Sequence, residues 1–275
     1  MSWMQVMEIP TYWHRQTASE PFFKDVVWSK PETKAHSGKL LVVGGNKHSL
    51  TAPGIAYAAA TRAGAGTVRV LLPDSVRKTI GKSFDEGEFA PSNPSGSFSK
   101  NALGQILDCA DWADATLLAG DFGRNSETAV LLEQVVEKYS GNLAISQDSL
   151  DYFVGDIGKL TDKDNIVIVA SLSQLQKMTR AGMSSVIVQH SMSLQALAGL
   201  LNSWSRETKI KILVYHSGNL IYADGGQIST TPAAELQNWE VPLAACVAVW
   251  WMQQPKQRFE AVTTAIYDYL AYTTS

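Results

Sequence analysis

Short apolar runs alternate along this chain with longer segments that have helix boundary signals. The run Lys39–Val43 stops at a glycine pair, as a buried parallel strand does where it enters a turn. The alanine-rich segment Thr51–Ala63 has Pro53 near its start and glycines just beyond its end, which predicts a helix. Thr67–Leu72 is the next apolar run, so these three segments predict one β-α-β unit.

The same alternation continues to the end of the chain and predicts a mainly parallel sheet with helices on both faces, a three-layer α/β/α fold. A hairpin-like turn is expected at Gly218-Asn219. No linker or repeat interrupts the pattern, so we expect an N-terminal arm over residues 1–35 and one domain over residues 36–275. Further strands are expected at residues 115–119, 143–145, 166–170, 185–188, 210–215 and 220–223, and further helices at residues 103–110, 127–139, 242–252 and 259–272.

Aromatic residues are dense in the arm and recur near the C-terminus. The arm holds Trp3, Tyr12, Trp13, Phe22, Phe23 and Trp28 without clear periodicity. Packing of these rings on the domain or on a neighbouring subunit is favoured over a ligand role. In the apolar segment 242–252, we expect one ring of Trp250-Trp251 in the core and the other at a subunit contact, with a ligand platform as the lesser alternative. A homo-oligomer is therefore expected.

Composition narrows the function classes. The chain has 275 residues, of which 45% are hydrophobic and 18% charged, as in ordinary globular proteins. The net charge is −3 and the 23 basic residues are scattered, so no nucleic-acid partner is expected. No apolar run approaches the roughly 20 residues of a membrane span, and the N-terminus lacks a signal pattern, so no membrane partner is expected.

Cysteine and histidine usage agrees with a cytoplasmic protein without a metal motif. The two cysteines, Cys109 and Cys246, are isolated, as is typical of a reducing compartment. None of the five histidines has the spacing of a metal site. His48 follows the Gly44-Gly45 turn, so a substrate contact is a minor alternative to an ordinary loop position.

Three ordered stretches resemble the ADP-dependent NAD(P)H-hydrate dehydratases of the ribokinase-like superfamily. His36–Asn46 is similar to the family's HKG followed by VLVIGGS, and Leu50–Val68 to YTGAPxLAAxAALRAGAGLV. Ala119–Thr128 is similar to GPGLGRDxET, and Asp148 follows where the family has DAD. The resemblance covers about residues 36–155 and implies a ribokinase-like fold.

The resemblance also implies a reaction and a site. The family removes water from hydrated NADH or NADPH and couples this to cleavage of ATP or ADP, with Mg²⁺ as a possible companion. The alternative to a ligand-binding role is that the glycines in these stretches serve only turns and helix ends. By resemblance, the substrate-binding residues are Gly44, Gly45, Asn46, His48, Thr51, Asp121, Gly123, Arg124 and Asp148.

The second half of the chain departs from the family at three motifs. Ala170–Gln174 stands where the family has TPHxGE, and Val214–Leu220 where it has LKGxxT. Asn238–Val241 stands where GSGD is expected, at a helix start whose glycine amides bind phosphate in the family. The degenerate nucleotide-binding positions are therefore His216, Asn238 and Trp239.

Glu240 is the candidate for a displaced catalytic carboxylate, one residue before the family's Asp position. A carboxylate in the first helical turn is stabilised by about 0.3–1 kcal/mol, so Glu240 either fills the anion site and repels phosphate or is an ordinary helix-start acid. Whether the chain is an enzyme stays open. The hypotheses are a dehydratase relative with impaired or lost catalysis, a pseudoenzyme serving as a binding or assembly module, and a small-molecule kinase, which needs the missing Asp.

Overall fold

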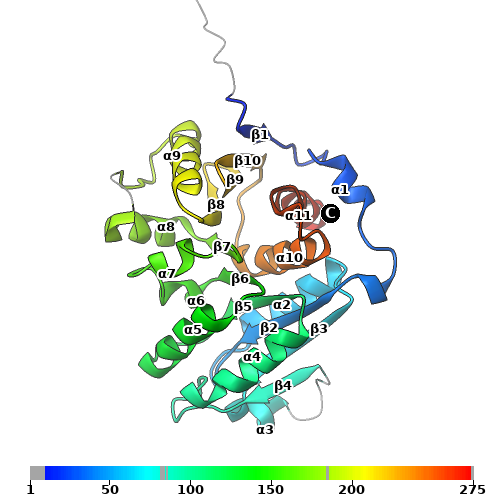
Figure 1. The fold of residues 1–275 in the computed structure, drawn as a ribbon, viewed down its shortest axis with the longest axis vertical. Helices are drawn as coiled ribbons and strands as arrows, with labels where there is room; N and C mark the ends of the chain where they lie inside the picture. Colours follow the sequence, from blue (N-terminus) through cyan, green and yellow to red (C-terminus); the bar gives the residue numbers. More distant parts are fainter. Residues whose placement is uncertain (1–9, 81–83, 85, 184–185, 274–275) are drawn as a thin grey trace, which may run out of the picture.

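A ten-stranded sheet organises the computed structural model, which describes residues 10–80, 84, 86–183 and 186–273 (Figure 1). The strand order is β1-β10-β9-β8-β7-β6-β5-β2-β3-β4. The strands are β1 (Trp13–Arg15), β2 (Lys39–Gly44), β3 (Thr67–Pro73), β4 (Gly87–Ala90), β5 (Ala115–Gly120), β6 (Asn142–Ser146), β7 (Ile166–Ala170), β8 (Lys211–His216), β9 (Asn219–Asp224) and β10 (Gln227–Pro232).

The sheet is parallel from β4 to β8, and β9 is antiparallel to both of its neighbours. This confirms the mainly parallel sheet, and the parallel pairing of β2 with β3 confirms the first β-α-β unit. From β2 the chain builds outward to β3 and β4, and then returns to place β5 on the other side of β2. The β2/β5 boundary is thus a topological switch point, where open α/β sheets bind ligands at the carboxyl ends of their strands.

Helices cover both faces of the sheet, which confirms the three-layer arrangement. The longer helices are α2 (Thr51–Arg62), α4 (Leu103–Trp112), α5 (Ser126–Lys138), α9 (Leu194–Glu207), α10 (Glu240–Gln253) and α11 (Arg258–Thr273). One buried core lies under α2, α10 and α11, and the other under α4, α5 and α9. Figure 1 shows α10 and α11 on one side of the sheet and α5 and α9 on the other.

Short helical segments fill the connections between strands. They are α1 (Lys24–Trp28), α3 (Arg77–Ile80), α6 (Asp148–Asp151), α7 (Gly158–Thr161), α8 (Leu172–Met178), the 3₁₀ turns Lys34–His36, Asp74–Val76 and Lys100–Ala102, and a π-helical turn, Thr179–Met183. None of the helices in the described part of the chain has the length and apolar character needed to cross a membrane.

Helix α10 is apolar on all sides because it is enclosed by the sheet, α2 and α11. Both of its tryptophans are buried, so the expectation that one ring lies at a subunit contact is wrong. The indole of Trp250 donates a hydrogen bond to Asp268 Oδ2 on α11 (2.9 Å), which satisfies its polar atom inside the protein.

Two expected elements differ from the structure. Residues 186–188 form no strand, because β8 already occupies the free edge of β7; residue 185 lies outside the described part. The hairpin turn is Ser217-Gly218 rather than Gly218-Asn219, because Asn219 pairs with His216 in the ladder. Both turn residues have positive φ (48° and 70°), as a two-residue hairpin of the type I′ class requires.

The described part of the N-terminal arm packs on its own sheet. Strand β1 pairs in parallel with β10, and the indole of Trp13 donates to Thr230 Oγ1 (2.9 Å). Gln16 Nε2 donates to the carbonyl of Thr263 on α11 (2.8 Å), so the arm joins the sheet edge to a helix. Trp28 is 87% exposed, and Trp3 lies outside the described residues.

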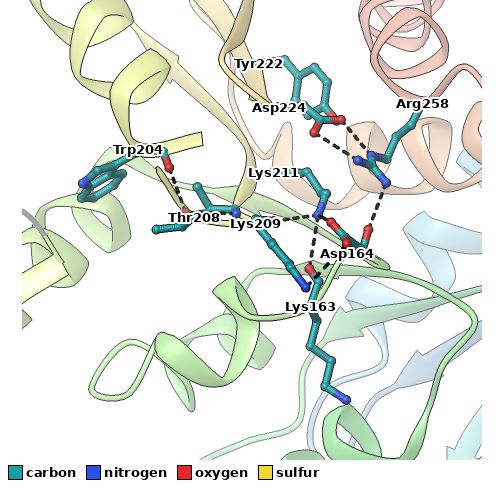
Figure 2. A network of polar contacts seen from close by, with 10 residues as sticks. Lys163, Asp164, Trp204, Thr208, Lys209, Lys211, Tyr222, Asp224 and Arg258 are labelled. Atoms are coloured by element: carbon teal, nitrogen blue, oxygen red, sulfur yellow. Dashed lines mark hydrogen bonds and ion pairs between the residues drawn. The ribbon is translucent and has the colours of Figure 1, made fainter. Parts of the chain in front are cut away.

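A network of charged groups lies where β7 and β8 begin and β9 ends, at the opposite end of the parallel strands from the β2/β5 switch point (Figure 2). Lys211 is buried, and its ammonium donates to Asp164 Oδ1 (3.1 Å) and to the carbonyls of Lys163 (3.2 Å) and Lys209 (2.7 Å). Arg258 from α11 binds Asp224 of β9 with two hydrogen bonds (2.8 and 3.1 Å). These bonds tie α11 to β9, and they tie the start of β8 to the end of the loop that precedes β7.

We expect Asp224→Asn to lower the free energy of unfolding by about 3 kcal/mol, because Arg258 then keeps a largely buried charge without its partner. Urea denaturation followed by circular dichroism measures the loss. Glu20→Gln removes the exposed partner of Lys24 and is the matched control, whose midpoint should not move. Equal midpoints for the two variants would contradict this account.

Candidate functional site

The candidate site begins where β2 and β5 end beside each other at the switch point. Gly44 pairs with Gly120, and a Cβ built on Gly44 would lie 2.5 Å from the Gly120 carbonyl oxygen. The amide of Gly45 donates to that same oxygen (3.0 Å), and its φ of +88° favours glycine. Backbone packing alone therefore accounts for both glycines, in agreement with the alternative that they serve only the turn. A ligand contact at Gly44 or Gly45 stays a prediction.

Asn46 holds the loop that follows β2. Its Nδ2 donates to the carbonyl of Asp121 (2.6 Å), and its Oδ1 accepts from the amides of His48 (2.7 Å) and Ser49 (3.2 Å). Asn46 is buried and its amide group is occupied by the backbone, so it positions the loop. His48 and Thr51 are exposed beyond it.

Asp121 caps helix α2 from across the switch point. The N-cap residue Leu50 offers no side-chain acceptor, and Asp121 Oδ2 accepts from the amide of Ala52 instead (2.7 Å). The carboxylate thus lies at the positive end of the helix, where negative charge is stabilised. Because the Ala52 amide already donates to Asp121, this first-turn amide is not available to a ligand anion.

Asp148 follows β6 and is the most unusual polar group of the site. Its Oδ2 accepts from the amide of Gly123 (3.1 Å), whereas its Oδ1 is buried without a hydrogen-bond partner in the described structure. Burial raises the pKa of Asp148 above its ordinary value, although the nearby backbone amides of Gly123 and Phe122 act in the opposite direction. A buried, unpaired carboxylate oxygen is costly and calls for a physical explanation.

A cavity of about 510 Å³ adjoins Asp148. Arg124 contributes a guanidinium that is exposed and makes no hydrogen bond or ion pair within the described residues, whereas Lys177 pairs with Asp151 (3.8 Å). Tyr152 donates its hydroxyl to the carbonyl of Gly123 and so fixes one wall. The cavity is lined by Gly123, Arg124, Asn125, Ser126, Ala129, Asp148, Asp151, Tyr152, Val154, Gly155 and Lys177.

The segment Ala170–Gln174 forms the end of β7 and the start of α8. Ser171 and Gln174 make a reciprocal capping box. The Ser171 hydroxyl accepts from the backbone N–H of Gln174 (3.3 Å), and the side-chain Oε1 of Gln174 accepts from the backbone N–H of Ser171 (3.0 Å). Gln174 Nε2 also donates to Asp151 Oδ1 (3.1 Å), so this segment supports the cavity wall.

A second cavity, of about 380 Å³, lies at the ends of β7 and β8. His216 is buried at the end of β8, and its Nε2 donates to the carbonyl of Met192 (2.6 Å). Trp239, the N-cap residue of α10, is buried against Tyr215, with ring centroids 6.2 Å apart. The lining residues are Ser171, Leu172, His190, Tyr215, His216, Ser217, Glu235 and Trp239.

Comparison with known proteins relates this geometry to a family. No protein-family model matches the chain. The bifunctional NAD(P)H-hydrate repair enzyme Nnr of Methanothermobacter thermautotrophicus is 29% identical over 152 residues, covering 53% of this chain and 29% of that enzyme. The enzyme of the same name from Salinibacter ruber is 31% identical over 129 residues, covering 46% of this chain and 24% of that enzyme. Part of the chain is therefore similar to a segment of the NAD(P)H-hydrate repair enzymes, and the matched segments span less than a third of the length of these two enzymes.

Solved structures agree with the fold of this chain. A ribokinase-like superfamily protein from Enterococcus faecalis has a TM-score of 0.70 at 14% identity, covering 94% of this chain and 87% of that one. An ADP/ATP-dependent NAD(P)H-hydrate dehydratase from Bacillus subtilis, co-crystallised with ATP and Mg²⁺, has a TM-score of 0.64 at 14% identity, covering 91% of this chain and 87% of that one. The ribokinase-like fold is therefore confirmed.

The structure brings part of the predicted substrate set together around the switch point, and three of these residues, Gly123, Arg124 and Asp148, line the first cavity, whereas Gly44, Gly45, Asn46, His48, Thr51 and Asp121 do not. Gly44, Gly45, Asn46 and Asp121 share one hydrogen-bonded loop cluster, and Gly123 joins that cluster to Asp148. Of the nucleotide positions, His216 and Trp239 line the second cavity, whereas Asn238 is exposed with a φ of 49° and does not. Glu240 also lies outside that lining, at the first residue of α10.

Eight of the eleven residues that line the first cavity were not among the predicted site residues. Among these, Asp151 ends α6, Tyr152 follows it and Lys177 lies on α8, and no motif marks them. The one available signal is that Asp151 and Tyr152 lie within four residues of Asp148. Across the described residues, no three side chains of His, Cys, Asp or Glu are placed to hold a metal ion together.

Gly44→Ala should lower the free energy of unfolding by about 2 kcal/mol, because its Cβ meets backbone that cannot move alone. Gly54→Ala is the matched control, since a Cβ on this residue of α2 has open space and alanine favours a helix by roughly 0.5–1 kcal/mol. Chemical denaturation distinguishes the two. The close approach of β2 and β5 would be refuted if Gly44→Ala were as stable as the parent.

Asp148→Asn should stabilise the protein at pH 7. Because folding raises the pKa of Asp148, ionisation of this carboxyl weakens the folded state as the pH rises above the unfolded pKa of about 4. Asparagine carries no such cost, so the difference should disappear on acidification below that value. Unfolding is followed by urea titration at a series of pH values.

Asp164→Asn is the control, because its effect on stability at neutral pH should have the opposite sign to that of Asp148→Asn. The hydrogen bond from Lys211 lowers the pKa of Asp164, so its charge stabilises the folded state at neutral pH, and this contribution is lost as the pH falls through the lowered value. Asp164→Asn should therefore be less stable than the parent at pH 7. A loss of stability in both variants would contradict the assignment of Asp148 as a destabilising carboxylate.

Proposed function

We propose that this chain binds an NAD(P)-type small molecule beside Asp148, and that nucleotide-coupled dehydration of hydrated NADH or NADPH is impaired or lost in it. The observation that carries the proposed loss of coupled dehydration is the burial of two residues at the start of α10. Trp239 and Val241 are buried in the core, at positions where the family pattern GSGD has its serine and its catalytic aspartate. The matched segments cover only 29% and 24% of the two curated relatives, so their activities are not transferred as they stand.

The residues at the ends of β7 and β8 do not fit ADP or ATP with Mg²⁺. A phosphate site draws on glycine amides or basic side chains, and Mg²⁺ on several oxygen ligands. Among the residues described there, Glu235 is the one carboxylate of the lining, and no lysine or arginine takes part. We therefore derive no step through a nucleotide phosphate or Mg²⁺ at this place.

The first cavity offers what an NAD(P)-type ligand needs. Its volume of about 510 Å³ suits a small-molecule site. Arg124 is free to bind a phosphate oxygen with charge-assisted hydrogen bonds. Asp148 lines this cavity, and its buried Oδ1 has no hydrogen-bond partner in the described structure; a ligand hydroxyl or amide that reached this oxygen would offset the cost of its burial.

Asp148 also supports a second candidate function, dehydration without a nucleotide. A carboxyl whose pKa is raised by burial holds its proton closer to neutral pH and can act as a general acid. It would donate this proton to a departing hydroxyl, so that the C–O bond breaks and water leaves. The resulting carboxylate would take a proton from the neighbouring carbon as the double bond forms, which restores the acid.

The other expectations stay predictions of this proposal. They are a cytoplasmic location, a homo-oligomer, the absence of nucleic-acid and membrane partners, and Glu240 as a displaced acid. A small-molecule kinase is disfavoured because Val241 occupies the position of the superfamily's catalytic aspartate.

Hydrated NADH mixed with the protein and ATP, ADP or no nucleotide should give no recovery of NADH absorbance. The Bacillus subtilis dehydratase serves as the positive control. Recovery that depends on ATP or ADP would overturn the proposed loss of coupled dehydration. Recovery without nucleotide, abolished in Asp148→Asn, would instead establish the second candidate.

Arg124→Gln should weaken binding of NADH by about tenfold, since it removes a charge-assisted contact. Lys138→Gln, at the far end of α5, is the matched control and should bind like the parent. The measurement is titration of NADH fluorescence. Unchanged NADH affinity in Arg124→Gln would exclude the first cavity as the binding place.

A further inference from the structure

The second cavity has the chemistry of a site for an organic cation. Four aromatic or imidazole rings contribute to its walls, from Tyr215, Trp239, His190 and His216. The Tyr215 and Trp239 rings are tilted by 56° with centroids 6.2 Å apart, and the His190 and His216 rings meet edge to face at 6.4 Å. The faces of the Tyr215 and Trp239 rings carry negative charge density and attract cations.

The lining of this cavity has an acidic side chain and no lysine or arginine among the described residues. Glu235 is exposed at the cavity and forms no ion pair within the described structure, so its carboxylate is available to a ligand. An anionic ligand would meet Glu235 without a fixed basic partner, whereas a cation would gain both the carboxylate and the ring faces.

The aromatic walls are held in place before any ligand arrives. The hydroxyl of Tyr215 donates to the carbonyl of Ala234 (3.1 Å). Trp239, the N-cap residue of α10, has an exposed fraction of only 5% and is therefore held by the core. His216 is fixed through its Nε2 to Met192 (2.6 Å). Preorganised rings lose little side-chain entropy on binding, so weak single contacts can add up.

We propose that the cavity lined by Tyr215, Trp239 and Glu235 binds a small organic cation, such as a quaternary ammonium or a protonated amine. This site is separate from the cavity beside Asp148 and does not depend on the function proposed there. It lies where the family pattern places a phosphate-binding segment, so the charge preference of that region would be reversed in this chain.

Choline is the probe, and its neutral isostere 3,3-dimethylbutan-1-ol is the matched control ligand. Ligand-observed NMR on the full chain measures both dissociation constants. We expect choline to bind at least about fivefold more tightly than the isostere, and Glu235→Gln to remove about that factor for choline alone. Tyr215→Leu should weaken choline binding by a similar factor, and Tyr215→Phe, which keeps the ring face and loses only the hydrogen bond to Ala234, should weaken it less.

Glu137→Gln, an exposed carboxylate on α5, is the control for a general loss of negative charge and should leave choline binding unchanged. The proposal is overturned by equal affinity of the two ligands, by no detectable choline binding, or by equal losses in Glu235→Gln and Glu137→Gln. It is also overturned if ADP binds the parent and Glu235→Gln tightens that binding, because the cavity would then be an anion site.

Discussion

The contact between the ends of β2 and β5 is the constraint on which the rest of the site depends. Gly44 lies so close to the Gly120 carbonyl that no side chain fits between them, and Gly45 bonds to the same oxygen. This approach brings the loop after β5 against the loop after β2. Asp121 can then cap α2, and Asn46 can hold the Asp121 carbonyl. The polar groups around the switch point are therefore largely satisfied by one another.

Asp148 is the exception to this internal satisfaction, and it borders the larger cavity. A protein that keeps a buried carboxylate oxygen unpaired gives up stability, which is a common feature of binding and catalytic sites. At the ends of β7 and β8 the opposite holds. There Trp239 fills space with a core side chain, and the remaining cavity is aromatic with a single carboxylate. The two cavities thus differ in charge and in the ligands they suit.

Much of the fold could be predicted because parallel strands buried on both faces appear in the sequence as apolar runs. Lys39–Val43 and Ile166–Ala170 are such runs, and both are strands. The hydrophobic pattern does not predict β1, β4 or β10, which are partly polar or lie at the sheet edges; β1 pairs with residues more than two hundred positions away. Nor does it predict α8, which begins inside the segment Ala170–Gln174, or α9, which precedes the segment Val214–Leu220.

The site was predictable only where motifs are local. The glycine pair and the Asp121–Arg124 loop are visible in the sequence, and Asp148 was found through its spacing to them. The burial of Asp148 and the contributions of Tyr152 and Lys177 come from separate segments joined by the sheet, so no local pattern contains them. Val186–Val188 shows the converse case, where strand-like residues find no neighbouring strand.

A crystal structure of the chain soaked with NADH tests the central claim most directly. The account predicts ligand density in the cavity beside Asp148, with a phosphate near Arg124 and a donor group within hydrogen-bond distance of Asp148 Oδ1. Density for the ligand phosphates at the start of α10, with Trp239 displaced from the core, would contradict it.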